Sequence, residues 1–291
     1  MPPELAILWR PLAAAVLGGL VCGIVGVWVV MMNIPFVGVA MSHAAFAGAV
    51  TGLLLGINPL IAAAVFCLAA SLLVGPVAER ADIEPDISVG IIFSLVLGLA
   101  FLAIGLMRGS RANALGLIWG SILLVAGRDL VVMAGAAAVV LVFLWLFYKE
   151  IQAVLYNREI ARAVGIPERA LFFAMLVLCG LSVTANLGTI GGLLIFSLIV
   201  NPPSAAYQLT YRLKTMYLLS ALFGVLSCLV GLLVSWLTDA PAGAVIIITS
   251  SAVFGLSLLA SPKRRNLRVG QAELGSGPCG AGAARSRPRW P

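Results

Sequence analysis

Charged residues are scarce in this chain. Of its 291 residues, 10% are charged and 62% are hydrophobic, and there is a single histidine. No Lys, Arg, Asp or Glu occurs between Pro11 and Ala78, and the mean hydropathy of the whole chain is +1.12. A soluble protein of this length needs far more charge to cover its surface. The composition therefore excludes a soluble protein, and the apolar runs are too long and too poorly alternating for a membrane barrel.

Several chemical motifs are also missing. No G-x-x-x-x-G-K-[ST] phosphate-binding loop occurs, so the chain is not an enzyme that hydrolyses ATP by that mechanism. None of the five cysteines forms a C-x-x-C pair. We read Cys22, Cys67, Cys179 and Cys228, which lie in apolar segments, as small core residues without a disulfide framework.

The uncharged runs predict an all-α, polytopic membrane protein with eight to ten transmembrane helices. The predicted spans are residues 11–32, 33–56, 59–77, 87–107, 130–148, 171–200, 216–237 and 243–260. Residues 113–126 are too few to cross comfortably and indicate a half or re-entrant helix. Glycines at 188, 191 and 192 interrupt residues 171–200, which predicts two helices meeting at a turn, the second one short.

The charged residues lie mainly between these spans. Residues 149–169 predict one amphipathic helix at the membrane interface, ended by Gly165 and Pro167. Its apolar positions are Ile151, Val154, Leu155, Ile160 and Val164. We expect residues 1–260 to form the transmembrane domain and residues 261–291 a basic, disordered tail on the cytoplasmic side. Because seven of the eighteen basic residues lie in that tail, the net charge of +7 does not indicate nucleic-acid binding.

His43 is the one strong polar ligand inside the first long apolar region. It stands beside a stripe of small residues spaced by four, Ala40, Ala44, Gly48, Gly52 and Gly56, along which another helix can approach closely. A G-x-x-x-G pair at Gly19 and Gly23 predicts a similar contact in the first span. His43 lies about 15 Å along its predicted helix, which is mid-membrane. It is either a pathway ligand for a divalent metal or a neutral side chain bonded to a backbone carbonyl.

The segment at residues 201–215, NPPSAAYQLTYRLKT, joins the short helix to the next span. Asn201 can cap a new helix, and Pro202 and Pro203 suit its first turn because they lack N–H groups. One interpretation is a coupling helix that docks on a soluble partner. The other is an ordinary connecting turn with positive residues on the cytoplasmic side.

Several motifs occur together in the order of a known family. The segments GGLLIFSLIVNPPSAAYQLTYRLKTM from Gly191 and LTDAPAGAVIIITSSAVFGLSLL from Leu237 resemble permease subunits of the zinc/manganese/iron-type metal ABC importers. Four shorter stretches are similar to further family segments: MSHAAFAG, EPDISVGIIFS, WGSILL and YNREIARAVGIP. The likeness extends from about residue 11 to residue 260 and implies a type II ABC-importer-like permease.

The resemblance implies an importer subunit for a divalent metal in the bacterial inner membrane. Its implied partners are a second copy of this chain, two ATP-hydrolysing cassette subunits and an extracytoplasmic metal-binding protein. It also implies which residues couple this chain to the ATPase: Pro202, Pro203, Ser204, Tyr207, Tyr211, Arg212 and Lys214. Glu159, in a second cytoplasmic motif, is implied to take part as well.

In the family, the histidine matched by His43 belongs to a metal-contacting layer with an aspartate one turn earlier. Here Val39 occupies that position. Met41 lies two residues from His43, on roughly the opposite side of a helix, so we do not expect it to substitute. Waters, Asn33, Asn186 and the His43 of a second copy could complete the ligand set.

Two other classes of membrane protein would need residues in different places. An intramembrane serine protease would need a serine near His43, but Ser42 points about 100° away and no serine lies in a G-x-S-G context. An ion-coupled secondary carrier for a metal or another small solute would need buried carboxylates. Asp129 and Asp239 lie only at the edges of spans.

Overall fold

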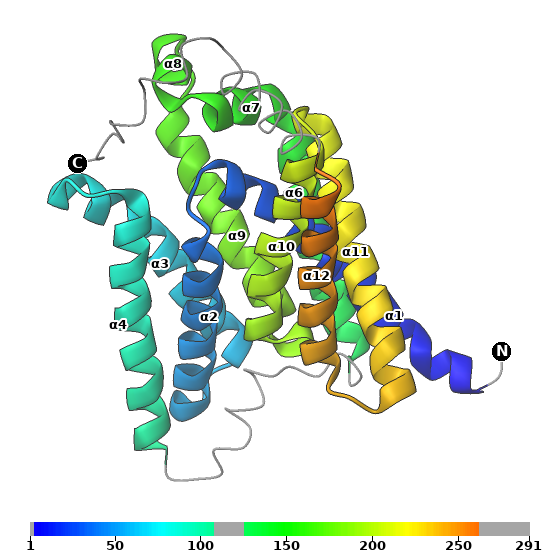
Figure 1. Cartoon of the computed structure of the whole chain (residues 1–291). Helices are drawn as coiled ribbons and strands as arrows, with labels where there is room; N and C mark the ends of the chain where they lie inside the picture. Colours follow the sequence, from blue (N-terminus) through cyan, green and yellow to red (C-terminus); the bar gives the residue numbers. More distant parts are fainter. Residues whose placement is uncertain (1–2, 108–124, 262–291) are drawn as a thin grey trace, which may run out of the picture.

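The computed structural model describes residues 3–107 and 125–261, which form a bundle of long helices (Figure 1). The helices are α1 (Pro3–Met31), α2 (Phe36–Leu55), α3 (Pro59–Ala81), α4 (Pro85–Leu106), α6 (Gly127–Leu146), α7 (Tyr148–Tyr156), α8 (Arg158–Ala163), α9 (Glu168–Ile190), α10 (Gly192–Leu209), α11 (Leu213–Thr238) and α12 (Ala242–Leu259). In the described ranges, eight helices are long and apolar enough to cross a membrane: all but α7, α8 and α10. The predicted class, an all-α polytopic membrane protein, is confirmed.

Consecutive long helices run in opposite directions, so the connections gather at two ends of the bundle (Figure 1). The upper end in Figure 1 carries α7, α8, the α10–α11 junction and the end of α12; we call it the α7–α8 end. The opposite end carries the α2–α3 and α11–α12 turns.

Glycine contacts hold the first and penultimate spans together, as the G-x-x-x-G pair predicted. A Cβ on Gly19 would lie 2.6 Å from the carbonyl oxygen of Gly224 on α11. Next to it, the Ser220 hydroxyl donates to the carbonyl of Gly23 at 2.6 Å. Only residues without bulky side chains permit such close backbone approach.

The stripe of small residues on α2 packs against α3, as predicted. A Cβ on Gly48 would lie 2.5 Å from the carbonyl oxygen of Ala62, and one on Gly52 would lie 2.9 Å from the Ala62 Cβ. Gly56 is not part of this contact. It ends α2 in the left-handed region, with φ +68°, which glycine adopts at little cost.

The turn between α9 and α10 lies at Gly191, where φ is +91°. The second helix, however, is not short. α10 continues through Asn201 to Leu209 with Pro202 and Pro203 in its interior, so the predicted new helix capped by Asn201 is wrong. The Asn201 amide instead donates to the hydroxyls of Ser250 and Ser251 on α12, at 3.1 and 3.0 Å.

The predicted interfacial helix is divided in two at Asn157. The Asn157 side chain accepts a hydrogen bond from Ile160 N at 3.0 Å and thereby caps α8. Ile151, Val154 and Leu155 are buried as predicted, but Ile160 and Val164 are exposed, because α8 starts a new helical phase. The predicted stop is confirmed at Gly165, whose φ is +85°.

Cys22, Cys67, Cys179 and Cys228 are buried and free, as expected for small core residues. Two predictions fall outside the described residues. Only residues 125 and 126 of the half helix at 113–126 are described, and only Ser261 of the tail at 261–291.

Candidate metal site and partner-docking surface

His43 projects from the first half of α2 and is half-buried beside α4. Its ring packs edge-to-face against Phe93 of α4, with ring centroids 5.0 Å apart and an interplanar angle of 85°. Val39 and Phe36 are also half-buried and share this side of α2, at helical spacing from His43. The two sides of α2 therefore differ: one packs on α3, and the other presents the only imidazole of the chain.

The hydrogen bond of His43 determines which ring nitrogen is free. Nδ1 lies 2.9 Å from the carbonyl oxygen of Val39. A carbonyl only accepts, so Nδ1 carries the proton in this contact, and in the neutral imidazole Nε2 then keeps its lone pair. Metal-binding histidines commonly donate their other N–H to a backbone carbonyl in this way. The carbonyl bond is thus compatible with a ligand role.

The other ligands considered for this site lie elsewhere. Met41 is fully buried on the α3 side, where Ser71 donates to its sulfur at 3.4 Å, so it does not substitute for the missing aspartate. The side-chain oxygen of Asn186 lies 3.0 Å from the place of a Cβ on Gly18 of α1. Asn33 is exposed in the α1–α2 connection. Neither asparagine is brought to His43.

One chain supplies a single strong ligand at this position. Among the described residues, no group of three or more His, Cys, Asp or Glu could hold a metal ion. A metal passing His43 would keep water ligands or meet an equivalent side chain from another chain.

A cleft at the α7–α8 end brings together residues that are far apart in sequence. Its volume is about 250 Å³. It is lined by Tyr156 from the end of α7, by Tyr207, Thr210, Tyr211, Arg212 and Leu213 from the α10–α11 junction, and by Met31 and Met216. Three of the predicted coupling residues, Tyr207, Tyr211 and Arg212, thus share one surface. Sequence reasoning missed Tyr156, although it begins the YNREIARAVGIP motif.

The remaining predicted coupling residues have different surroundings. Pro202 and Pro203 are buried inside the bundle, and Ser204 is half-buried beside them. The Lys214 ammonium lies 5.6 Å from the ring centroid of Tyr148, and partial burial together with the neighbouring Tyr156 raises the pKa of Tyr148. Glu159 is exposed on α8, shortly after Tyr156.

Two sets of contacts fix this end of the molecule. The buried Glu168 at the start of α9 accepts hydrogen bonds from Arg158 Nη2 at 3.0 Å and from Arg162 Nε at 3.1 Å, which holds α8 against α9. The hydroxyl of Ser261, after α12, donates to the carbonyl of Gln208 at 3.0 Å. The end of α12 therefore lies beside the α10–α11 junction.

This arrangement defines a class of protein. A bundle of membrane-length helices, with an imidazole beside its core and a structured surface at one end, is a polytopic membrane protein with the architecture that transport permeases share. More specifically, the chain belongs to the ABC 3 transport family, which matches residues 4–261. The sequence-based identification of a metal ABC importer permease is thereby confirmed and is favoured over an ion-coupled carrier.

Known relatives cover most of the chain. The manganese transport system membrane protein MntC of Halalkalibacterium halodurans is 32% identical over 257 residues, 88% of each chain. The manganese import system permease protein ScaB of Streptococcus gordonii is 29% identical, over 90% of this chain and 94% of the relative. The solved structure of PsaBC from Streptococcus pneumoniae in complex with Fab superposes with a TM-score of 0.81 at 28% identity, covering 91% of this chain and 95% of that one. A metal-chelate type ABC transporter in an inward-facing conformation, 15% identical with a TM-score of 0.72, shares the fold.

Proposed function

We propose that this chain is the membrane-spanning subunit of a bacterial inner-membrane importer for manganese. Its partners are a second copy of itself, two ATP-hydrolysing cassette subunits and an extracytoplasmic metal-binding protein. The relatives named for manganese support the choice of metal. Zinc and iron are the alternatives that the sequence resemblance implies. The single observation that carries the proposal is His43, an imidazole with Nε2 free in a half-buried position inside the membrane-spanning part.

The distribution of charge supports an orientation. Seven basic residues lie at the α7–α8 end: Arg80, Lys149, Arg158, Arg162, Arg169, Arg212 and Lys214. The other basic residues of the described ranges are Arg10 and Arg128, toward the opposite end. Cytoplasmic loops carry the excess of Lys and Arg. The α7–α8 end and the C-terminal tail therefore face the cytoplasm, and the start of α1 faces outward.

The metal is the substrate, and the two His43 side chains of the dimer form its transient site. Imidazole binds Zn²⁺ and Fe²⁺ more strongly than Mn²⁺, and oxygen ligands from water, which Mn²⁺ prefers, complete the shell. Because Val39 adds no carboxylate, the site binds weakly enough to release its ion again. Weak, multi-step binding is what passage through a membrane requires.

Helix α10 links the docking cleft to the metal site. One end of α10 forms the cleft at Tyr207, and its middle packs on α2, where Phe196 and Ile199 lie about 3.4 and 3.3 Å from the place of a Cβ on Gly38. Gly38 precedes His43 by little more than one turn. When ATP binding brings the partner ATPases together, the force enters at the cleft and α10 transmits it toward His43.

The proposal is tested by manganese uptake in cells that carry the partner subunits. The uptake rate of the His43→Ala variant should be at least about 100-fold lower than that of the unmodified protein. Loss of a side chain that only hydrogen-bonds to a metal ligand already lowers metal affinity or activity by about 10–100-fold. Thr51→Val, which removes a hydroxyl bonded only to Ala47 O of the same helix, should keep full uptake. Normal uptake by a correctly assembled His43→Ala variant would refute the site.

Coupling is tested at the cleft. Arg212→Ala or Tyr211→Ala should leave ATP hydrolysis by the assembled complex running while uptake falls, because the force no longer reaches α10. Lys149→Ala changes a basic residue at the same end that does not line the cleft, and it should behave as the unmodified protein. The proposed coupling role is wrong if the cleft variants transport as many ions per ATP hydrolysed as the control does.

A further inference from the structure

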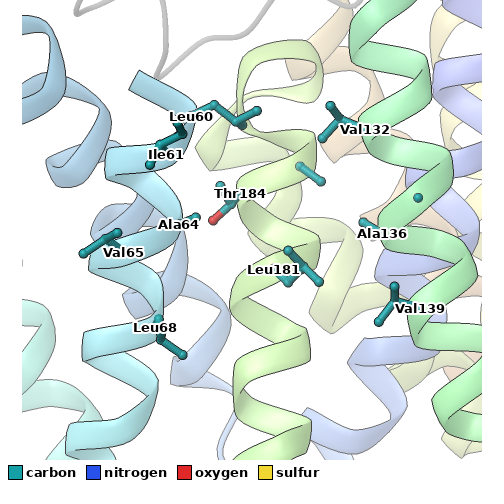
Figure 2. Close-up of a pocket in the computed structure, with 12 residues that line it drawn as sticks. Leu60, Ile61, Ala64, Val65, Leu68, Val132, Ala136, Val139, Leu181 and Thr184 are labelled. Atoms are coloured by element: carbon teal, nitrogen blue, oxygen red, sulfur yellow. The ribbon is translucent and has the colours of Figure 1, made fainter. Parts of the chain in front are cut away.

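A groove lies on the outer surface of the helix bundle, between α3 and α6, and α9 forms its floor (Figure 2). It encloses about 570 Å³. Val65 and Leu68 line one side, Val139 lines the other, and Leu181 lies on the floor (Figure 2). The one hydroxyl in this lining, that of Thr184, donates to Gly180 O at 2.8 Å. The wall therefore offers no free hydrogen-bonding group, and it suits only a hydrocarbon.

The groove continues into a polar mouth at the start of α6. A second cavity of about 480 Å³ shares Leu60, Val132 and Thr184 with the first and extends to Arg128 and Asp129. The side chain of Arg128 is 89% exposed, and its Nε lies 3.6 Å from Asp129 Oδ1. Both residues belong to the first turn of a span, at the level of the lipid headgroups. The mouth thus presents one positive and one negative charge.

The groove lies on the side of the molecule away from His43. On a helix with 100° per residue, Gly48 and Gly52 project about 140° and 180° away from His43. They pack on α3, so α3 and the groove beyond it lie across α2 from the imidazole. A second copy that brings its own His43 to the pathway would meet the opposite face. This step rests on the proposed homodimer, and it leaves the groove facing the bilayer.

The geometry points to a bound phospholipid with a zwitterionic, amine-bearing headgroup, as in phosphatidylethanolamine. One acyl chain lies in the groove and covers Leu181, which is 37% exposed on an otherwise largely buried helix. The phosphate contacts the Arg128 guanidinium, whose planar fork matches phosphate oxygens, and the ammonium contacts Asp129. A lipid with a net negative headgroup would meet the Asp129 carboxylate unfavourably.

The test is native mass spectrometry of the full-length chain, extracted in mild detergent from membranes containing phosphatidylethanolamine and phosphatidylglycerol. We expect one phosphatidylethanolamine to be retained per chain. Gly135→Leu should abolish retention, since Gly135 lines the groove and a Cβ there meets no atom within 4 Å, so the larger side chain fits and fills the space. Gly98→Leu, at an equally open glycine on α4 outside the groove, should keep the lipid.

The mouth is tested separately with surface variants that leave the fold intact. Arg128→Gln should lower retention about tenfold, as expected for loss of one charge-assisted phosphate contact. Arg10→Gln, at another exposed basic residue, should leave it unchanged. Retention that is insensitive to Gly135→Leu, or that prefers phosphatidylglycerol, would overturn the proposal. So would a disulfide between two Val139→Cys chains, which would place a second copy in the groove. Since no readout depends on transport, failure here is distinguishable from failure of the proposed function.

Discussion

At the scale of single residues, the Val39 carbonyl orients the His43 ring, and the Val39 side chain offers no polar atom beside it. The carbonyl belongs to the backbone, so its 2.9 Å contact with Nδ1 does not involve the side chain at position 39. Ring orientation and ligand count are therefore separable at this site. We expect a substitution at Val39 to change the number of ligands without changing the orientation of the ring.

Val39→Asp separates them experimentally. A carboxylate one turn before His43 adds a hard oxygen ligand on the same side of α2, so the affinity of the proposed dimer for Mn²⁺ should rise by roughly tenfold or more. Val39→Leu, which keeps the position apolar, is the control and should bind as the unmodified protein does. Calorimetric titration with Mn²⁺ measures both. Equal affinities for the two variants would show that position 39 does not face the metal.

At the scale of elements, glycine contacts determine which helices can lie side by side. α1 and α11 approach so closely that a Cβ on Gly224 would overlap the carbonyl oxygen of Gly19. An added methyl group that forces the two helices apart should lower the free energy of unfolding as overpacking of a core does, by about 1–3 kcal/mol.

Gly224→Ala should accordingly lower the thermal midpoint of the purified protein. Gly98→Ala provides a matched change at a helical glycine where an added Cβ meets nothing within 4 Å. It should leave the midpoint unchanged or raise it slightly, because alanine has the higher helix propensity. A thermal scan in one detergent compares the two, and equal midpoints would contradict the packing argument.

Elements with a simple cause were predictable from the sequence. Uncharged runs of membrane length predicted the spans, and some bounds agree closely: the span predicted at residues 243–260 is helix α12, Ala242–Leu259. α10 was not predictable. Pro202 and Pro203 look like a helix start, but here they lie inside one helix and deprive the carbonyls of Leu198 and Ile199 of their usual donors. Gly26 lets α1 pack directly against Ile199 O, a tertiary contact that no local pattern reveals.

The candidate sites were predictable to different degrees. His43 stood out because it is the only histidine in an uncharged region, and its surroundings agree with a ligand role. Only part of the cleft could be predicted from the sequence. Tyr207, Tyr211 and Arg212 lie in one short segment, whereas Tyr156 reaches them through the packing of α7, which sequence spacing does not encode.

At the scale of the whole molecule, the two ends of the bundle make the proposed orientation testable. Glu159 and Asp239 are exposed at opposite ends. In a background in which Cys279 is replaced by serine, a membrane-impermeant thiol reagent applied to intact cells should modify the Asp239→Cys variant. It should modify Glu159→Cys only after the cells are opened, because α8 faces the cytoplasm in the proposed orientation. The four other cysteines are buried and should not react. The reverse labelling pattern would show that the protein has the opposite orientation in the membrane.

The hydrogen bond between Ser261 and Gln208 has a practical consequence for anyone who handles this protein. Ser261 lies beside the α10–α11 junction, which also forms one side of the cleft. If the proposed ATPase docks at this cleft, an affinity tag or fluorescent fusion placed close behind α12 would compete with it for space and mimic a loss of coupling. Labels are better attached ahead of α1, on the far side of the bilayer in the proposed orientation.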